Sequence, residues 1–255
     1  MLSLECSAVN AMEITYQPIL NLQTGRIEKC EALCNPPEAG ADIAAFFMSA
    51  EMNGSLRGFT DRVFDSVFSD WQKHGSPTTD VSVNLTVGDL AEPDLAKRVE
   101  KACKKHRLDP ARLWFEVDDR AQSLVDPVGL QSMSQIVSLG VRFSIDGFGD
   151  ELSQTTHYEV GGLPVAEIKI NARYVRDADE NMRHRDVVIA SVTLARDLNI
   201  GVAAKSIERE NIALLMRRLG CTHGQGFYFA RPTAANVVAA LVAKMAQASP
   251  LESGR

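Results

Sequence analysis

The stretch RFSIDGFGDE, residues 142–151, contains the pattern from which the fold is inferred. A short apolar run ends in one aspartate, Asp146, and a glycine-rich turn follows directly. In α/β proteins the carboxyl ends of parallel strands form one edge of the sheet, and functional side chains gather at that edge. This strand is therefore predicted to belong to an active or binding site, provided that other strands deliver partners for Asp146.

Short apolar, β-branched runs alternate with longer segments of helical periodicity along the whole chain. Strands are predicted at 13–20, 26–33, 81–85, 112–117, 141–145, 166–170, 200–204 and, from a weak pattern, 221–225. Helices are predicted at 41–52, 57–74, 93–107, 126–139, 184–198, 207–219 and 233–247. Strands separated by helices indicate a mostly parallel sheet, and about eight of them favour a closed α/β barrel, with a doubly wound sheet as the alternative.

Two of the predicted helices carry recognisable end signals. Ser206 is a predicted N-cap for the helix at 207–219, and Gly220 is its predicted stop. Pro232 and Thr233 are predicted to occupy N-terminal positions of the last helix.

The composition is that of a globular protein: the 255 residues are 45% hydrophobic and 24% charged. We expect one domain at 11–247, an N-terminal extension at 1–10 and a disordered tail at 248–255. The net charge of −6 argues against a nucleic-acid partner, which usually requires a basic surface. With no apolar run of about 20 residues and no signal-like N-terminus, we expect no membrane segment and a cytoplasmic protein. The five scattered cysteines are expected to be reduced thiols.

Polar residues close or follow the predicted strands at seven places. They are Glu31, Asn84, Glu116, Asp146, Lys169, Lys205 and Gln225. A single polar residue at a strand end is usually an exposed strand end or the N-cap of the next helix. Four of them, Glu31, Asn84, Glu116 and Asp146, form an all-oxygen set of the kind that Mg²⁺, Mn²⁺ or Ca²⁺ prefers, and Lys169 could balance charge. The residues alone therefore predict a metal or phosphate pocket in a barrel.

Several motifs occur together in one order: YQPILNLQTGRIEKCEAL, VSVNLT, DPARLWFEVDD, LGVRFSIDGFG, VAEIKIN and ALLMRRLGCTHGQGFYFARP. With EAL itself at residues 31–33, the chain resembles the EAL domain family over essentially its full length. The resemblance implies a single-domain, TIM-like (β/α)8 barrel of the EAL type with an atypical first strand. Active members of that family hydrolyse cyclic di-GMP to linear pGpG with two divalent metals, which activate a water and stabilise the developing charge.

The resemblance implies that part of the family's pocket is retained. The retained metal- or ligand-binding positions are Glu31, Asn84, Glu116, Asp146, Lys169 and Gln225. The last glutamate of a further family motif is also kept, as Glu208.

Five family positions are substituted. Gly147 replaces an aspartate that binds metal, and Lys205 replaces a glutamate that is a metal ligand and proposed general base. Asn35 replaces a phosphate-contacting arginine, Asp119 shortens a glutamate, and Asn171 replaces an aspartate. The resemblance therefore implies a degenerate, catalytically inactive site.

Lys205 is the substitution that changes the charge most. Like charges 4 Å apart repel by roughly 4 kcal/mol at an effective dielectric constant of about 20, so the ammonium opposes the binding of a second cation. We expect it to pair with Glu31 or Asp146 and to replace part of a metal's charge. No cofactor is expected to be required. One Mg²⁺, Mn²⁺ or Ca²⁺ ion bound by Glu31, Asn84, Glu116 and Asp146 stays an open alternative.

Three functions follow from this resemblance. The first is an inactive regulatory adaptor that binds a protein partner, of the transcription or motility regulator class, because a domain without catalysis or an attached output domain would act by contact. The second is a non-hydrolysing cyclic di-GMP receptor. Its candidate nucleotide contacts are Gln17, Phe229, Arg231 and Pro232, with Lys169, Lys205 or Arg231 compensating for Asn35. The third, disfavoured function is an active phosphodiesterase; residual activity stays open.

Overall fold

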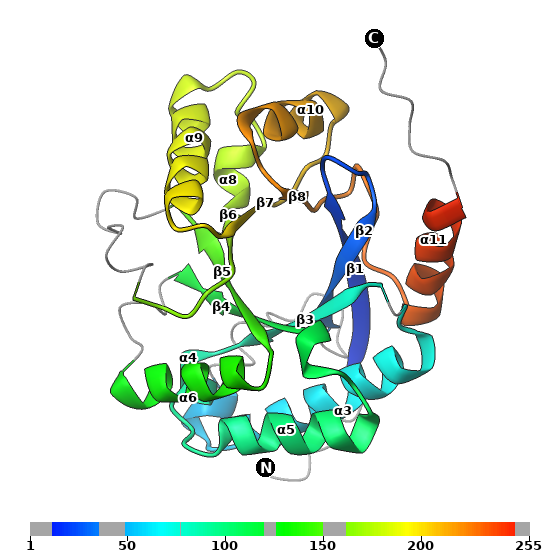
Figure 1. The fold of residues 1–255 in the computed structure, drawn as a ribbon, viewed down its shortest axis with the longest axis vertical. Helices are drawn as coiled ribbons and strands as arrows, with labels where there is room; N and C mark the ends of the chain where they lie inside the picture. The colour runs from blue at the N-terminus through cyan, green and yellow to red at the C-terminus, as the bar shows by residue number, and fades with distance from the viewer. Residues whose placement is uncertain (1–11, 36–48, 77, 120–125, 150–161, 248–255) are drawn as a thin grey trace.

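The structure of the protein is a computed structural model that describes residues 12–35, 49–76, 78–119, 126–149 and 162–247 (Figure 1). Its strands form a closed barrel in the order β1-β2-β3-β4-β5-β6-β7-β8. The predicted α/β barrel is confirmed, and the doubly wound alternative is wrong. The predicted extension at 1–10 and tail at 248–255 lie outside the described residues.

The eight strands are β1 Glu13–Asn21, β2 Ile27–Asn35, β3 Asp80–Leu85, β4 Leu113–Asp118, β5 Arg142–Phe148, β6 Glu167–Ile170, β7 Gly201–Ala204 and β8 His223–Gly224. The helices are α3 Leu56–His74, α4 Val87–Leu90, α5 Leu95–His106, α6 Pro127–Ser138, α8 Ala172–Val175, α9 Met182–Asp197, α10 Glu210–Leu219 and α11 Ala235–Gln247, with a 3-10 turn at Pro110–Arg112. They surround the barrel (Figure 1). No helix among the described residues combines the length and apolar character needed to cross a membrane.

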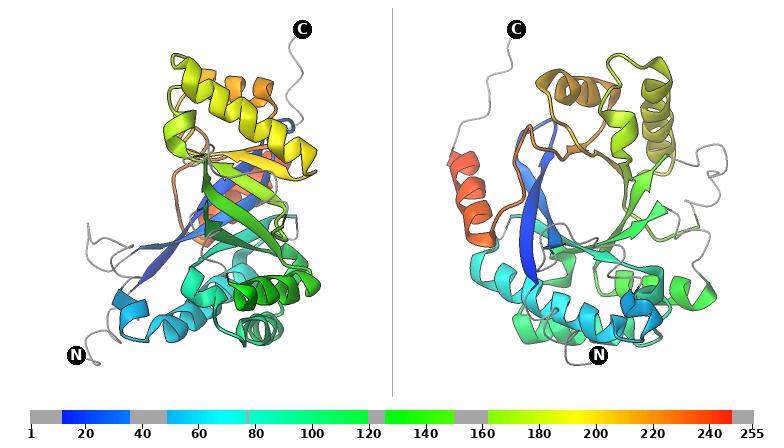
Figure 2. Two further views of the ribbon diagram at one scale, coloured as in Figure 1. Left: turned by 90° about the vertical axis from the view of Figure 1, so that its left-hand side faces the viewer. Right: turned by 180° about the vertical axis from the view of Figure 1, so that it is seen from behind.

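Strand β1 runs against its neighbours. It pairs antiparallel with both β2 and β8, whereas the strands from β2 to β8 are parallel to one another. A tight turn joins β1 to β2: Asn21 Oδ1 accepts the backbone N–H groups of Gln23 and Thr24, and Gly25 takes a φ of 69°. Figure 2 shows this hairpin in blue along one side of the barrel, where α11 packs against β1.

Several predicted boundaries are corrected. Helix α10 begins at Glu210 with Arg209 as its N-cap, so Ser206 is not the cap; Ser206 takes a φ of 56° instead. Helix α11 begins at Ala235, because Thr233 exchanges backbone hydrogen bonds with Tyr16 of β1. Of the predicted helix at 41–52, residues 49–52 are helical and the rest lie outside the described residues. Helices α4 and α8 were not predicted, because four residues are too few for a helical pattern.

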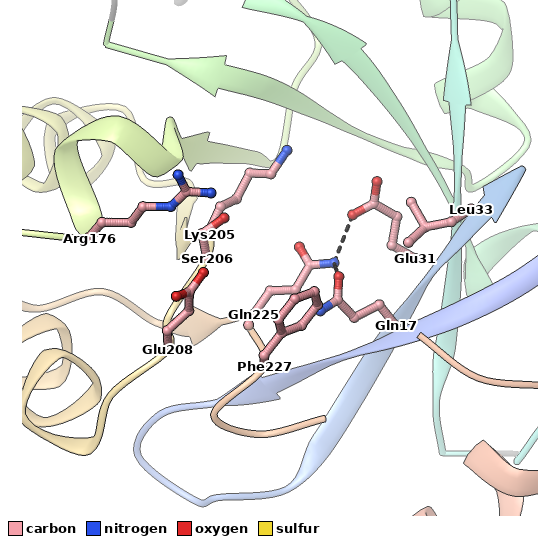
Figure 3. A pocket seen from close by; sticks show the side chains of 10 residues that line it. Gln17, Glu31, Leu33, Arg176, Lys205, Ser206, Glu208, Gln225 and Phe227 are labelled. Atoms are coloured by element: carbon pink, nitrogen blue, oxygen red, sulfur yellow. Dashed lines mark hydrogen bonds between the residues drawn. The ribbon is translucent and has the colours of Figure 1, made fainter. Parts of the chain in front are cut away.

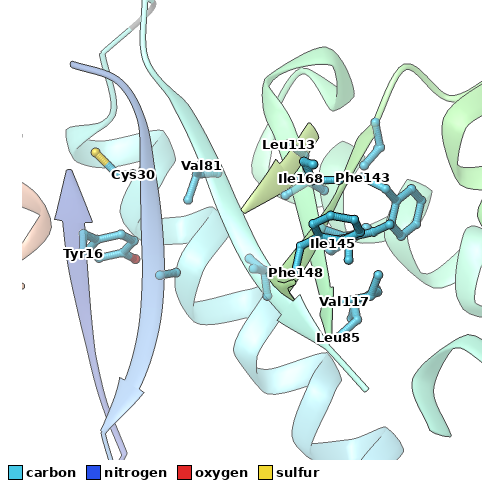
Figure 4. Close-up of a cluster of buried hydrophobic side chains, with 14 of the residues drawn as sticks. Tyr16, Cys30, Val81, Leu85, Leu113, Val117, Phe143, Ile145, Phe148 and Ile168 are labelled. Carbon is cyan, nitrogen blue, oxygen red and sulfur yellow. The ribbon is translucent and has the colours of Figure 1, made fainter. Parts of the chain in front are cut away.

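Alternation along the strands separates an apolar outer face from a polar interior. The outward residues of β3 to β6 include Val83, Phe115, Phe143 and Ile168, and all are buried. Figure 4 shows Phe143 and Ile168 in this cluster. Phe115 lies 5.6 Å from Phe64 of α3 and 5.7 Å from Phe143, measured between ring centroids. Burying an aromatic side chain of this size contributes about 1.5–3 kcal/mol. This apolar layer holds the helices on the barrel and leaves charged side chains inside it.

Charged side chains form two layers inside the barrel. The lower layer, nearer the amino ends of β2 and β6, joins three strands. Lys29 Nζ lies 2.5 Å from Glu167 Oε1 and 3.9 Å from the Trp114 ring centroid. His223 Nδ1 lies 3.2 Å from Glu167 Oε2, and its Nε2 lies 3.1 Å from Glu28 Oε2. Burial alone would lower the pKa of His223, but the two carboxylates raise it above its usual value. Because β8 has only two residues, His223 supplies a side-chain connection where backbone pairing is shortest.

We expect His223→Gln to destabilise the barrel in a pH-dependent way. A histidine whose pKa is raised by folding stabilises the protein fully below its unfolded pKa of about 6.5, and this contribution is lost as the pH rises through the folded pKa. The loss should be about 1–3 kcal/mol at pH 5.5 and smaller at pH 8.5. Urea unfolding at both pH values measures it.

His74→Gln is the control for this experiment, because His74 lies exposed at the end of α3. A constant difference between wild type and His223→Gln across this pH range would contradict the charged state of His223.

Candidate functional site at the carboxyl ends of the strands

Lys169 lies at the centre of the upper interior layer. Its side chain is fully buried on β6, and Nζ lies 2.8 Å from Glu31 Oε2 and 2.5 Å from Glu116 Oε2. Burial opposes the charge of Lys169, but the carboxylates of Glu116 and Glu31 raise its pKa well above the usual value. The lysine is therefore a resident cation between strands β2, β4 and β6.

The two glutamates beside Lys169 differ in their protonation. Burial alone would raise the pKa of Glu31, but Lys169 and Lys205 hold it well below its usual range. Burial and the neighbouring Glu31 raise the pKa of Glu116. Glu31 is thus the ionised member of the pair, and Glu116 is the member that accepts a proton more readily.

Neutral side chains donate further hydrogen bonds to these glutamates. Asn84 Nδ2 donates to Glu31 Oε1 at 3.1 Å, and Gln225 Nε2 donates to Glu31 Oε2 at 2.8 Å. Ser82 Oγ donates to Glu116 Oε1 at 2.6 Å. All four carboxylate oxygens therefore already accept a hydrogen bond.

Lys205 and Asp146 form a second ion pair in this layer. Lys205 Nζ lies 2.7 Å from both carboxylate oxygens of Asp146. The structure thus selects Asp146 over Glu31 as the partner of Lys205. Both side chains are about one quarter exposed, at 26% and 22%. Gly147 follows in a bulge of β5 with a φ of 78°, a left-handed conformation that favours glycine.

A cavity of about 220 Å³ is lined by one member of each ion pair, Glu31 and Lys205 (Figure 3). Its lining includes charged, amide and aromatic side chains. The lining residues are Gln17, Glu31, Leu33, Arg176, Lys205, Ser206, Glu208, Gln225, Gly226 and Phe227. Gln225 Nε2 also donates to Gln17 Oε1 at 3.1 Å, so two amides form part of the wall. Such a mixture of groups suits a polar ligand with an aromatic part.

Gly226 lets the two loops that build this cavity touch. A Cβ placed on it would lie 2.0 Å from the Ile207 carbonyl oxygen, so no larger residue fits without a backbone shift. The backbone N–H of Ile207 donates to the backbone carbonyl oxygen of Gln225 at 3.0 Å, and that of Tyr228 donates to the backbone carbonyl oxygen of Ile207 at 3.0 Å. The loop after β7, which carries Lys205, is thereby locked to the loop after β8.

The structure does not bring every predicted residue into the cavity. Asn35 donates its amide to Thr15 Oγ1 at 2.9 Å, and Asn171 caps α8. Asp119 follows β4 and is buried. None of these three lines the cavity. These three positions, like the six retained family positions, stay site residues predicted from the resemblance.

Only one of the four candidate nucleotide contacts lines the cavity. Gln17 lines the cavity, whereas Phe229, Arg231 and Pro232 do not. The guanidinium of Arg231 lies over the Phe227 ring, 4.3 Å from its centroid. Phe227 and Arg176 were not among the predicted site residues. The position of Phe227, two residues after Gln225, was an available signal; Arg176 follows the short helix α8, which has no sequence pattern.

In this arrangement the all-oxygen set of Glu31, Asn84, Glu116 and Asp146 does not fit a divalent ion. The carboxylate oxygens of Glu31 and Glu116 are engaged by Lys169 and neutral donors, and those of Asp146 by Lys205. Among the described residues, no group of three or more histidine, cysteine or acidic side chains is arranged to hold a metal. Binding of one ion stays a prediction that requires these contacts to be displaced.

Comparison with known proteins places this geometry in context. The sequence profile of the EAL domain matches residues 3–232. The bifunctional diguanylate cyclase/cyclic di-GMP phosphodiesterase MucR of Pseudomonas aeruginosa is 29% identical over 234 residues, which cover 89% of this chain and 34% of that protein. The chain thus spans about a third of the length of the curated relatives that it matches first.

Solved structures share the fold. A structure of PaMucR phosphodiesterase in complex with c-di-GMP has a TM-score of 0.84 and 27% identity, covering 93% of this chain and 98% of that chain. A calcium and cyclic di-GMP complex of BlrP1 from Klebsiella pneumoniae has a TM-score of 0.79 and 21% identity, covering 88% of this chain and 56% of that chain.

We expect Lys169→Met to cost far more stability than Lys205→Met. Removing Lys169 leaves two buried carboxylates without a cation, which costs about 3–5 kcal/mol, whereas a partly exposed pair contributes about 1 kcal/mol or less. Urea unfolding of both variants measures the difference.

The Lys169→Met deficit should shrink from pH 8 to pH 5. Without the ammonium, the buried carboxylates bind protons more tightly in the folded state, so the variant gains stability as the pH falls. Similar small losses in the two variants would contradict a structural role for the buried layer.

Proposed function

Because the chain belongs to the EAL domain family, we propose that it is a catalytically inactive member that acts in bacterial cyclic di-GMP-linked signalling as a regulatory adaptor, through contacts with a protein partner. The partner class expected from the resemblance is a regulator of transcription or motility. The observation that carries the proposal is the ion pair of Lys205 with Asp146, at 2.7 Å from both carboxylate oxygens.

The ammonium of Lys205 opposes two-metal chemistry in two ways. It occupies both oxygens of a carboxylate that would otherwise be a ligand, and it repels a cation 4 Å away by roughly 4 kcal/mol per unit charge at an effective dielectric constant of about 20. A protonated lysine also cannot accept a proton from the attacking water.

Glu116 is a poor replacement for the missing base. The pKa of Glu116 is raised, which favours proton uptake, but only 1% of the residue is exposed and both oxygens accept hydrogen bonds. A general base must reach the proton that it abstracts, directly or through one water. The inaccessibility of Glu116 supports regulation by binding.

A second candidate function is a metal-independent receptor for cyclic di-GMP. The observation that favours it is the cavity of about 220 Å³, which presents Arg176, Lys205, Phe227 and two glutamine amides. The cyclic di-GMP complex of the 27% identical PaMucR supports this class of ligand. Of the predicted compensating cations, Lys205 reaches the cavity, whereas Lys169 is buried between carboxylates and Arg231 lies outside the lining.

We expect the wild-type protein to release no pGpG from cyclic di-GMP in Mg²⁺ or Mn²⁺, as followed by chromatography. We also expect Mn²⁺ to raise the Tm of Lys205→Glu and not that of the wild type, because the new carboxylate beside Asp146 adds an oxygen ligand and removes a repelling cation.

Lys205→Met is the control, since it removes the ammonium without adding a ligand. Wild-type turnover that Glu31→Ala abolishes would contradict the inactive assignment.

The receptor candidate is tested by calorimetric titration with cyclic di-GMP in Mg²⁺ and again in EDTA. We expect the same Kd in both buffers and no pGpG in either sample, because the cations of the cavity are side chains. No heat at high micromolar ligand would remove the receptor candidate and leave the adaptor.

A further inference from the structure

We propose that Arg176 and Lys205 form a phosphodiester-binding subsite in the wall of the cavity. Arg176 supplies the positively charged hydrogen-bond donor to phosphate that the asparagine at position 35 cannot supply. The proposal rests on the receptor function above. It assigns a ligand-binding role to a residue that none of the sequence motifs identified.

The position of Arg176 is fixed while its side chain is available. Arg176 caps the end of α8, and its carbonyl oxygen accepts Arg209 Nη2 at 2.9 Å. Arg209 also reaches Asp179, and Arg185 donates to the Ala178 and Asp179 carbonyl oxygens at 2.8 and 2.7 Å. The segment that follows α8 is therefore held by other arginines.

The guanidinium of Arg176 lines the cavity, and among the described residues no carboxylate pairs with it. Figure 3 shows it directed toward Lys205. An arginine without an acidic partner beside a polar cavity is a donor fork that matches the geometry of phosphate oxygens.

Lys205 adds a second cation to the same wall. Its ammonium has three N–H donors, of which Asp146 takes two. The remaining donor and the 26% exposure of the side chain leave it able to contact a bound anion.

Two further features point to a ligand at this place. The side-chain oxygen of Gln225 is buried and accepts no hydrogen bond from the described residues, although the amide nitrogen donates two. A buried acceptor without a donor is costly, and a hydroxyl or N–H on a ligand would satisfy it. Ser206, beside Lys205, holds a left-handed backbone with a φ of 56°, a strain that recurs at binding sites.

The charge of the cavity selects the class of phosphate. Two cations line the cavity: the guanidinium of Arg176, unpaired among the described residues, and the ammonium of Lys205, which is shared with Asp146. The carboxylates of Glu31 and Glu208 line it as well and reduce its net positive charge. A phosphodiester carries a single negative charge, whereas a phosphomonoester carries about two near pH 7. Phe227, backed by Arg231, offers an aromatic surface to a base attached to that phosphate. The subsite therefore suits the phosphodiester of a dinucleotide.

The first test is calorimetry with cyclic di-GMP in EDTA on wild type, Arg176→Gln, Arg176→Lys and Arg183→Gln. Arg183 is an exposed arginine on α9 that does not line the cavity, and its substitution should leave the Kd unchanged. Arg176→Gln should weaken binding at least tenfold, since a hydrogen bond to a charged group contributes about 1.5–3 kcal/mol. Arg176→Lys should recover part of the affinity, because the charge returns without the fork.

The second test uses the phosphodiester group alone. Dimethyl phosphate is added, against NaCl of equal ionic strength, to protein labelled with ¹⁵N-arginine. A shift of one Nε–H resonance that is absent from Arg176→Gln supports the subsite whether or not cyclic di-GMP binds.

The outcomes separate the two levels of the proposal. Cyclic di-GMP binding that Arg176→Gln leaves unchanged overturns the subsite and keeps the receptor. A dimethyl phosphate shift at Arg176 without cyclic di-GMP binding overturns the receptor and keeps the subsite. Absence of both effects overturns both.

Discussion

Buried lysines that must meet carboxylates across the barrel determine how its interior is arranged. Strand β2 carries Lys29 and then Glu31, and β6 carries Glu167 and then Lys169, so each level of the barrel pairs opposite charges. A slide of two residues between the strands would set like charges against each other. Because an uncompensated buried charge costs several kcal/mol, these pairs disfavour such a change of register.

The same requirement explains how the upper layer balances its charge with side chains. Three carboxylates, those of Glu31, Glu116 and Asp146, face the two ammonium groups of Lys169 and Lys205. Glu116 has the raised pKa, so one proton on it would make the layer neutral. A charge balance reached internally lowers the demand for an external cation, and this is the physical basis of the proposal that the domain acts by binding.

Much of the fold could be predicted from the sequence, because apolar strand runs separated by segments of helical periodicity are local signals. Those signals led from Asp146 to a closed barrel and identified the residues that meet around Lys169. The partner of Lys205 could not be chosen between Glu31 and Asp146, since that depends on where β7 stands relative to β5. Arg176 had no signal, because it lies beyond a four-residue helix whose place is set by packing. Ser206 was predicted to be a helix N-cap because serine favours that position, but its backbone takes a left-handed conformation.

Gly226 makes the two walls of the cavity one mechanical unit. The loop that carries Lys205 follows β7 and the loop that carries Phe227 follows β8, and they meet at a contact that tolerates no side chain. A change of backbone on one side must therefore be transmitted to the other. Redesign of this pocket for a different ligand has to treat Lys205 and Phe227 together, and side-chain substitutions on the fixed backbone are a safer route than loop insertion.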